Sequence, residues 1–238
     1  MVHVRIGIIG TSWWADTMYL PSLAGSEKAI VVACCGRNEE RARKLAEIWI
    51  IPKVYTDWQT MLNEEPLDAL IISTTNSTHC PITLAALEKG LHVLCEKPLA
   101  LNYAEAKRML ESSQIHQAVT MVPFTYSFVP MAQTIKRLLS EGYLGKLHHL
   151  NFRYYANFGR SPEYHWRFNK KLAGSGSLGD VGSHFLYLAV WFFGEVTHVY
   201  AELDTVIERP KLDPAGQPYV QADDFSIVVL TFANGAKG

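Results

Sequence analysis

The order of apolar and amphipathic segments is the strongest constraint on what this chain can fold into. Before residue 123, apolar runs of strand length alternate with segments of helical periodicity. The expected strands are residues 4–9, 29–35, 53–55, 68–74, 92–96 and 117–122. Strands that alternate with helices pair in parallel, because each crossover returns the chain to the same end of the sheet. The pattern predicts an α/β fold with a doubly wound parallel sheet.

The rhythm changes after Pro123. The later segments are interpreted as a helix at 129–142, a half-exposed antiparallel strand at 146–159, a helix at 183–194, and strands at 198–207 and 225–235. We therefore predict two domains, 1–122 with the parallel sheet and 123–238 with an α+β fold and an open, mainly antiparallel sheet. The last strand and turn leave that sheet without a neighbour, so the chain is expected to be a fragment of a longer protein.

Composition limits the possible partners. The 238 residues are 48% hydrophobic and 19% charged, enough apolar sequence for a full core. A formal net charge of −1 gives no reason to expect nucleic acid or a membrane, so a small-molecule substrate is expected. The four cysteines form no CxxC pair and are expected to be reduced thiols, and no metal site is expected. The N-terminal apolar run is too short for a signal sequence, which predicts a cytoplasmic protein.

The turn after the first expected strand reads GIIGTSWWA. Its sequence follows the dinucleotide-binding pattern GxGxxG/A, with a serine at the second glycine position. Such a turn also occurs in ordinary strand-to-helix connections, but its place at the first crossover favours phosphate binding. The expected cofactor contacts are Gly10, Thr11, Ser12 and one of Trp13 and Trp14, which otherwise pack at the helix start.

The end of the second expected strand bears on which dinucleotide binds. Gly36 stands where a ribose-binding acid is usual, and Arg37 follows it. The missing carboxylate removes repulsion against a 2′-phosphate, with which a guanidinium can pair. We predict NADP in preference to NAD, bound near Gly36, Arg37 and Arg41. The alternative is that the two arginines belong to a solvated helix start.

Polar residues follow the next two expected strands, at the sheet edge where ligands bind in open α/β folds. Those after the fourth strand, expected to contact the cofactor, are Thr74, Thr75, Asn76 and His79. Glu96 and Lys97 follow the fifth. Lys97 can hold an ammonium against a carbonyl or alkoxide oxygen, and Glu96 can position the lysine or the cofactor. Pro98 is expected to fix this turn, and a cis bond is one way to do so. The alternative is a surface ion pair worth less than about 1 kcal/mol.

The segment DVGSH carries the second candidate chemistry. Asp180 and His184 are four residues apart, so on a helical turn they share a face. A carboxylate beside an imidazole raises its basicity, which suits a histidine that accepts a hydroxyl proton as hydride leaves carbon. The glycines of AGSGSLGDVG are expected to let the backbone approach a ligand. A lone helical histidine is usually structural, but the paired acid favours catalysis.

These motifs, with GLHVLCEKPLA and the stretch from WRF to FFGE, resemble the Gfo/Idh/MocA family of NAD(P)-dependent oxidoreductases. The resemblance implies a Rossmann domain followed by a domain whose open sheet carries the substrate and often the oligomer contact, hence a dimer or tetramer. It implies that Lys97, Asp180 and His184 are catalytic. It also implies substrate or nicotinamide contacts from Tyr126, Trp166 and Arg167.

Two departures from the family pattern concern the substrate. Ser127 and Tyr187 stand where members often carry charge, so polyol specificity does not carry over. The predicted function is hydride transfer between nicotinamide and a secondary alcohol or carbonyl of a sugar, cyclic polyol or related molecule. The alternative is a regulatory protein that senses the dinucleotide without turnover. Lys97, Asp180 and His184 together favour the enzyme, because a sensor needs no proton relay.

Overall fold

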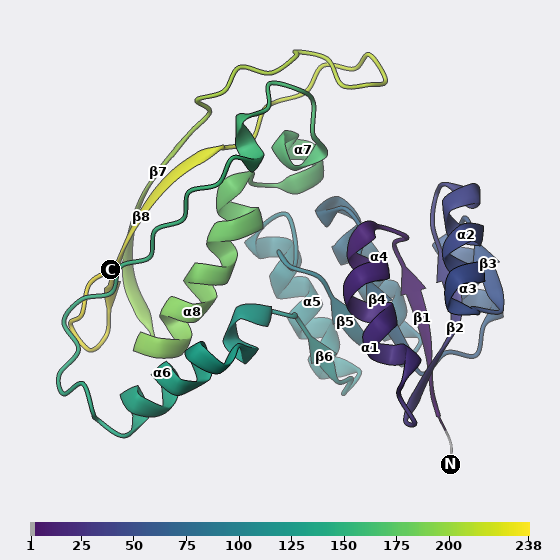
Figure 1. Cartoon of the computed structure of the whole chain (residues 1–238), viewed down its shortest axis with the longest axis horizontal. Coiled ribbons are helices and arrows are strands. Elements are labelled where there is room, and N and C mark those ends of the chain that lie inside the picture. The colour runs from purple at the N-terminus through teal and green to yellow at the C-terminus, as the bar shows by residue number, and fades with distance from the viewer. Residues whose placement is uncertain (1–2) are drawn as a thin grey trace. The chain divides into compact units, whose positions relative to one another are not determined.

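The computed structural model describes residues 3–238, which form two compact units divided after Pro123 (Figure 1). The first unit holds a six-stranded parallel sheet, and the second holds helices packed on a two-stranded antiparallel sheet. The predicted α/β class with a doubly wound parallel sheet is confirmed. Within residues 3–238, no helix combines the length and apolar character needed to cross a membrane.

The sheet of the first unit has the order β3-β2-β1-β4-β5-β6. Its strands are β1 (Val4–Ile9), β2 (Ala29–Cys35), β3 (Lys53–Tyr55), β4 (Ala69–Ile72), β5 (His92–Cys95) and β6 (Thr120–Met121). Its helices are the π-helical turn η1 (Ala15–Tyr19), α1 (Leu20–Ala24), α2 (Glu39–Trp49), α3 (Trp58–Glu64), the 3-10 turn η2 (Asn76–Thr78), α4 (His79–Glu88) and α5 (Tyr103–Ile115). All six predicted strands are present, and β4 and β5 end before the polar residues of the carboxyl edge.

Both faces of this sheet are buried. Adjacent residues of β1 point to opposite faces, and Ile8 and Ile9 are 0% and 3% exposed. Ile8 packs in the cluster that contains Leu45 of α2, whereas Ile9 packs in the cluster that contains Ile82 of α4. Burial on both faces explains why these strands are continuous apolar runs in the sequence.

Single residues mark two helix boundaries of the first unit. The side chain of Asn38 caps α2 by accepting a hydrogen bond of 2.8 Å from the backbone N of Arg41. Gly90 follows the end of α4 with φ +75°, a conformation that favours glycine. After the turn that follows β1, residues 15–24 form a π-helical turn that continues into α1.

The second unit is built on the packing of α8 along the sheet of β7 and β8 (Figure 1). Its elements are η3 (Thr125–Phe128), α6 (Pro130–Ser140), η4 (Phe158–Arg160), η5 (Trp166–Phe168), α7 (Lys170–Ala173), the π-helical turn η6 (Leu178–Gly182), α8 (Ser183–Phe193), β7 (Val196–Asp204) and β8 (Phe225–Phe232). Leu188 and Phe192 of α8 share a core with Leu230 and Phe232 of β8. The antiparallel pairing runs from Val196 opposite Phe232 to Asp204 opposite Phe225.

The strand expected at 146–159 is not formed. Residues 150–156 form no strand, and the segment's backbone pairing is confined to its start, where Leu150 N donates to Lys237 O at 2.9 Å. The alternation of apolar side chains was interpreted correctly, because the rings of Phe152 and Tyr154 both lie against Phe185 of α8. The alternation indicates which side chains pack against the core, but a β-strand also needs an adjacent strand with which its backbone can form hydrogen bonds.

Candidate functional site

The turn after β1 brings three strand ends together. Gly10 has φ +112°, and its N–H donates to Cys35 O at the end of β2 at 2.9 Å. A Cβ at Gly10 would lie 2.0 Å from Ser73 O, just past β4, so only glycine fits. The Ser12 hydroxyl is buried and has no hydrogen-bond partner within the described residues. This orphaned hydroxyl suits a bound phosphate oxygen, so the turn fits a dinucleotide.

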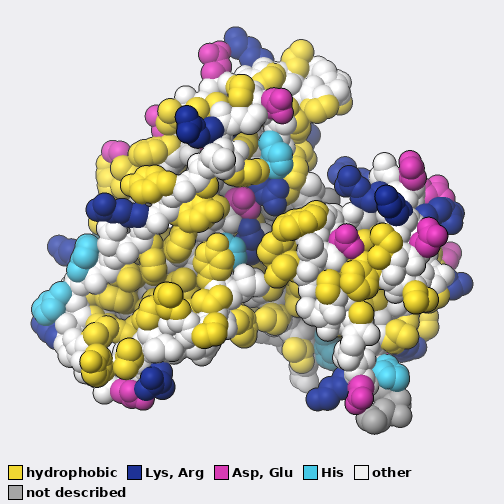
Figure 2. All heavy atoms as spheres, in the orientation of Figure 1, with side chains coloured by type: hydrophobic (Ala, Val, Ile, Leu, Met, Phe, Trp, Pro, Cys, Tyr) yellow, Lys and Arg dark blue, Asp and Glu magenta, His cyan; other side chains and the backbone are white. Residues whose placement is uncertain are grey.

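Gly36, at the end of β2, is held as glycine by a neighbouring side chain. A Cβ at this position would lie 2.4 Å from Thr11 Oγ1. Arg37 is exposed and makes no ion pair within the described part of the chain, whereas Glu39 pairs with Arg43 at 2.6 Å. Charged side chains gather over α2 in Figure 2. The Thr11 side chain therefore leaves no room for an acidic side chain at position 36. The next residue in the chain, Arg37, supplies a guanidinium group.

Glu96 is buried at the end of β5, which excludes the surface ion pair considered above. Its Oε1 accepts a hydrogen bond of 2.6 Å from Trp14 Nε1 and another from the Tyr19 hydroxyl. Its Oε2 accepts from Lys97 N at 3.0 Å. Burial, reinforced by the Glu96 charge, raises the pKa of Tyr19. The peptide bond between Lys97 and Pro98 is cis.

The two tryptophans of the β1 turn therefore differ. Trp14 is half-buried and donates to Glu96, whereas Trp13 is 69% exposed. Of the two, Trp13 keeps the surface that a cofactor could contact.

His79 lies inside the first unit, which contradicts the expected contact with a cofactor. It is 0% exposed, with Nδ1 3.0 Å from Pro98 O and Nε2 3.3 Å from Thr74 O. Burial lowers its pKa, and a neutral ring donates from one nitrogen only, which the shorter contact assigns to Nδ1. His79 thus joins the ends of β4 and β5. Asn76 is also buried, whereas Thr74 and Thr75 keep exposed surface at the sheet edge.

In the second unit, Asp180 lies in η6 and forms an ion pair with Arg167, with 3.1 Å between Oδ1 and Nε. The Arg167 guanidinium also lies over the Trp166 ring, 4.6 Å from its centre. The predicted WR pair and Asp180 therefore meet. The neighbouring His165 accepts from Arg167 N through Nδ1 at 3.3 Å, and burial lowers its pKa.

His184 is buried in the first turn of α8. The ring of Tyr126 stacks on its imidazole, with centres 4.4 Å apart and planes inclined by 21°. Phe124 approaches the same imidazole edge-on at 5.9 Å and stacks on Tyr187 at 4.4 Å. Ser127 is buried, and its hydroxyl donates to Phe124 O at 2.8 Å. Sequence reasoning identified Tyr126 and Tyr187 but not the aromatic packing that fixes the imidazole plane.

The glycine-rich approach to Asp180 has a different purpose from the one expected. A Cβ at Gly176 would lie 1.8 Å from Asp223 O, so the close approach is to the backbone of Asp223 and not to a ligand. Asp223 is buried and binds residues 175–178 through its carboxylate. The sequence analysis missed this residue. Asp223 and Asp224 directly precede an apolar strand, and acidic side chains at such a position are expected to be paired if they are buried.

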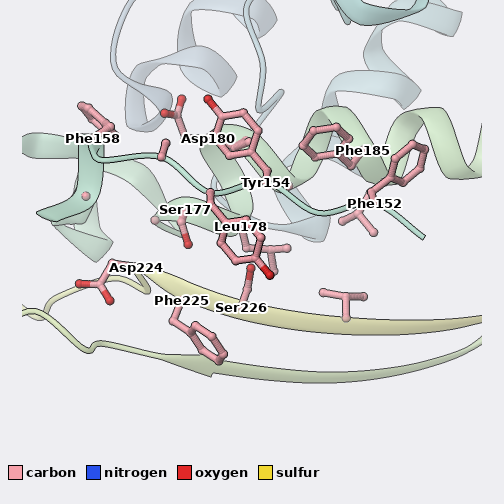
Figure 3. Close-up of a pocket in the computed structure, with 18 of the residues that line it drawn as sticks. Phe152, Tyr154, Phe158, Ser177, Leu178, Asp180, Phe185, Asp224, Phe225 and Ser226 are labelled. Atoms are coloured by element: carbon pink, nitrogen blue, oxygen red, sulfur yellow. The ribbon is translucent and has the colours of Figure 1, made fainter. Parts of the chain in front are cut away.

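The second unit also contains a pocket of about 610 Å³ (Figure 3). Aromatic side chains border it on several sides: Phe152, Tyr154, Phe158, Phe185 and Phe225. Asp180 and Arg167 are part of its lining, whereas His184 and Tyr126 are not. Among residues 3–238, no group of three or more His, Cys, Asp and Glu side chains could hold a metal ion.

Two family models match the chain. The model described as an oxidoreductase family with an NAD-binding Rossmann fold matches residues 4–124, and the GFO/IDH/MocA C-terminal domain matches residues 132–238. The two matches together span both compact units.

Named relatives are dehydrogenases of polyhydroxylated molecules. Levoglucosan dehydrogenase of Pseudarthrobacter phenanthrenivorans is 33% identical over 84% of this chain and 55% of its own. The scyllo-inositol 2-dehydrogenase (NADP(+)) of Bacillus subtilis is 30% identical over 95% of this chain and 69% of its own. A solved levoglucosan dehydrogenase with NADH and levoglucosan matches all of this chain and 66% of its own, with 31% identity and a TM-score of 0.89. The chain thus spans about half to two thirds of these proteins.

Proposed function

Because the chain belongs to the Gfo/Idh/MocA family of oxidoreductases, we propose that it is a nicotinamide-dependent dehydrogenase. Its substrate would be a secondary alcohol or carbonyl group of a sugar, cyclic polyol or related small molecule. The proposal rests on the observation that one chain contains both a candidate dinucleotide site and candidate residues for proton transfer. The first unit has a dinucleotide-type turn and the EKP lysine, and the second has Asp180 and His184. The relatives named for levoglucosan and scyllo-inositol support the substrate class.

The proposed roles follow from the chemistry of each side chain. The nicotinamide, when bound, accepts or supplies the hydride. His184 takes the proton of the substrate hydroxyl as the hydride leaves the carbon, so that the alcohol becomes a carbonyl with atoms and charge balanced. Lys97 is proposed to stabilise negative charge that develops on the reacting oxygen. Stacking on Tyr126 holds the imidazole plane, and Arg167 holds Asp180.

We propose NADP as the preferred cofactor. The Thr11 side chain leaves no room for a side chain at position 36. The acidic residue that is usual at this position, and that would repel a 2′-phosphate, is therefore absent. Arg37 is exposed next to that position and has no competing ion pair within the described residues. The Bacillus relative is named for NADP, whereas the levoglucosan enzyme was solved with NADH, so the two nucleotides need direct comparison.

The proposed substrate site includes Asp180 and Arg167, which line the aromatic pocket, together with His184 and Tyr126, which do not. A polyol needs several hydrogen-bond donors and acceptors, because each buried hydroxyl left unpaired costs binding energy. The pocket's lining combines phenylalanine rings with polar side chains such as Asp180 and Ser177 (Figure 3). Asp180, His184, Arg167 and Tyr126 supply polar groups suited to hydroxyls, so we propose that the substrate binds at these residues.

We also propose that the protein is a homo-oligomer through the sheet of β7 and β8. Three exposed apolar side chains lie on one face of this sheet: Tyr200 at 58%, opposite Val229 at 44%, and Ile227 at 45%, opposite Glu202. Exposed apolar side chains grouped on one sheet face are typical of an interaction surface. The solution mass measured by light scattering tests this, and Ile227→Lys should shift the protein towards the monomer.

A substrate panel tests the enzyme proposal. Sugars, inositols and dihydrodiols are incubated with NADP or NAD at alkaline pH, and cofactor reduction is followed by absorbance. Reduction with at least one substrate is expected. Tight cofactor binding with no turnover across the panel would instead favour the dinucleotide sensor.

A further inference from the structure

We propose that Asp223 is a positioning residue for the proton relay. Its carboxylate would hold in place the start of η6, the turn that contains Asp180 and leads into His184. The proposal rests on the proposed function, because that function makes Asp180 and His184 the groups that handle the proton. The contacts from which it is argued lie entirely within the second unit.

Both carboxylate oxygens of Asp223 are saturated by one short segment. Oδ1 accepts from Ser175 Oγ at 2.7 Å and from Gly176 N at 2.8 Å. Oδ2 accepts from Ser177 Oγ at 3.1 Å and from Leu178 N at 2.8 Å. The backbone of Asp223 adds a fifth bond, from Ser177 N to its carbonyl oxygen at 2.8 Å. Four consecutive residues are thus bound to one buried side chain.

These contacts fall where the π-helical turn begins. Leu178 is the first residue of η6, and the Ser177 side chain does not cap the turn itself. The first free amide of the turn is therefore capped by an acid 45 residues further along the chain. Asp180 N then donates to Gly176 O at 2.9 Å, and η6 continues directly into α8. Movement of residues 175–178 would therefore displace Asp180 and His184 together.

The neighbouring acid has a separate task. Asp224 pairs with Arg209 at 2.7 Å, with both side chains almost fully buried, and accepts from Val206 N at 2.7 Å. It anchors the loop before Arg209, whereas Asp223 anchors the turn before Asp180. The two adjacent acids are therefore not interchangeable, and the pair between Asp224 and Arg209 involves no atom of the Asp223 side chain.

The sharpest variant is Asp223→Asn, which keeps the shape of the side chain. Its amide nitrogen cannot accept, so either Gly176 N or Leu178 N loses its acceptor. We expect the amides of residues 176–182 to exchange hydrogen at least about tenfold faster, and turnover to fall at least about tenfold. Cofactor KM should stay within about twofold, because the proposed phosphate-binding turn is in the first unit. The NMR-detected pKa of His184 should move by about half a unit or more.

Asp213→Asn is the matched control. Asp213 also accepts from two backbone amides, Ala215 N at 2.9 Å and Gln217 N at 2.8 Å, but in an exposed turn that bears none of the proposed site residues. It should leave turnover and the His184 pKa unchanged. If Asp223→Asn does not fold, the double variant Ser175→Ala and Ser177→Ala removes two donors and keeps the backbone bonds. The same changes, smaller in size, are then expected.

The outcomes separate this proposal from the proposed function. A folded Asp223→Asn protein with wild-type turnover, pH profile and His184 pKa would overturn the positioning role. If the wild-type protein reduces no cofactor on any substrate, the proposed function fails. The NMR pKa of His184 then decides alone: a shift supports the positioning role, and an unchanged value rejects it.

Discussion

Trp14 and Glu96 lie 82 residues apart in the chain and are joined by a hydrogen bond of 2.6 Å from the indole Nε1 to the carboxyl Oε1. The bond ties the turn after β1, where a dinucleotide phosphate would bind, to the turn that carries Lys97. Because Glu96 is buried, loss of this donor cannot be replaced easily by water.

Trp14→Phe should therefore destabilise the protein by about 1–3 kcal/mol, the cost of depriving a buried acceptor of its donor. Urea denaturation followed by circular dichroism measures the change. Trp13→Phe is the control, since Trp13 is 69% exposed, and it should cost less than about 0.5 kcal/mol. Equal losses from the two variants would show that the indole bond has no special weight.

Arg37→Ala should remove the preference for NADP. In the unmutated protein NADP should bind at least about tenfold tighter than NAD, which corresponds to about 1.4 kcal/mol from pairing of the guanidinium with the 2′-phosphate. Titration with both nucleotides gives the ratio. Arg108→Ala, at an exposed position on α5, should leave it unchanged. Equal affinities before any substitution would contradict the assignment.

Thr11 should control which residue is tolerated at position 36. Gly36→Asp alone should lower stability, because its Cβ would lie 2.4 Å from Thr11 Oγ1. Adding Thr11→Gly should restore stability and move the preference towards NAD, since the new carboxylate can bind the ribose hydroxyls. Thermal melting and nucleotide titration are the measurements. A single variant as stable as the wild type would show that Thr11 moves aside freely.

Lys97→Ala and His184→Ala should each lower turnover by about a hundredfold or more. Loss of a charge-stabilising donor typically raises the barrier by about 2.7–4 kcal/mol, and the two losses should be less than additive if both groups act on one transition state. Steady-state kinetics on a substrate found in the panel tests this. His198→Ala, an exposed histidine of β7, is the control. Near-normal turnover in both variants would show that the EKP motif has a structural role and no catalytic role.

The four cysteine thiols should be unreactive in the folded protein. All four are buried, and burial raises the pKa of Cys34 to about 11 and that of Cys35 and Cys95 to about 12. The pKa of Cys80 is also raised. The reactive thiolate is therefore scarce at pH 8. A chromogenic disulfide reagent should modify almost none of them until urea unfolds the chain, and then all four; rapid labelling of the native protein would contradict this.

Local sequence determined most of the first unit. The strands are buried on both faces, so they are unbroken apolar runs, and the helices between them keep one apolar side. Asn38 and Gly90 mark helix ends because capping and positive φ depend on single residues. The cysteines were correctly expected to be free. Family motifs pointed to Lys97, Asp180 and His184 because their residue types and spacing are visible in the chain.

Tertiary structure decided what those residues touch. His79 stands among polar residues in the sequence, yet it is fully buried between two strand ends. Residues 150–156 alternate like a strand but lack the ladder that would make one. Glu96 with Trp14, Thr11 with Gly36, and Asp223 with residues 175–178 are all contacts between segments far apart in sequence. Periodicity and capping are local and can be predicted from short windows, whereas these partners depend on how the packed core brings distant segments together.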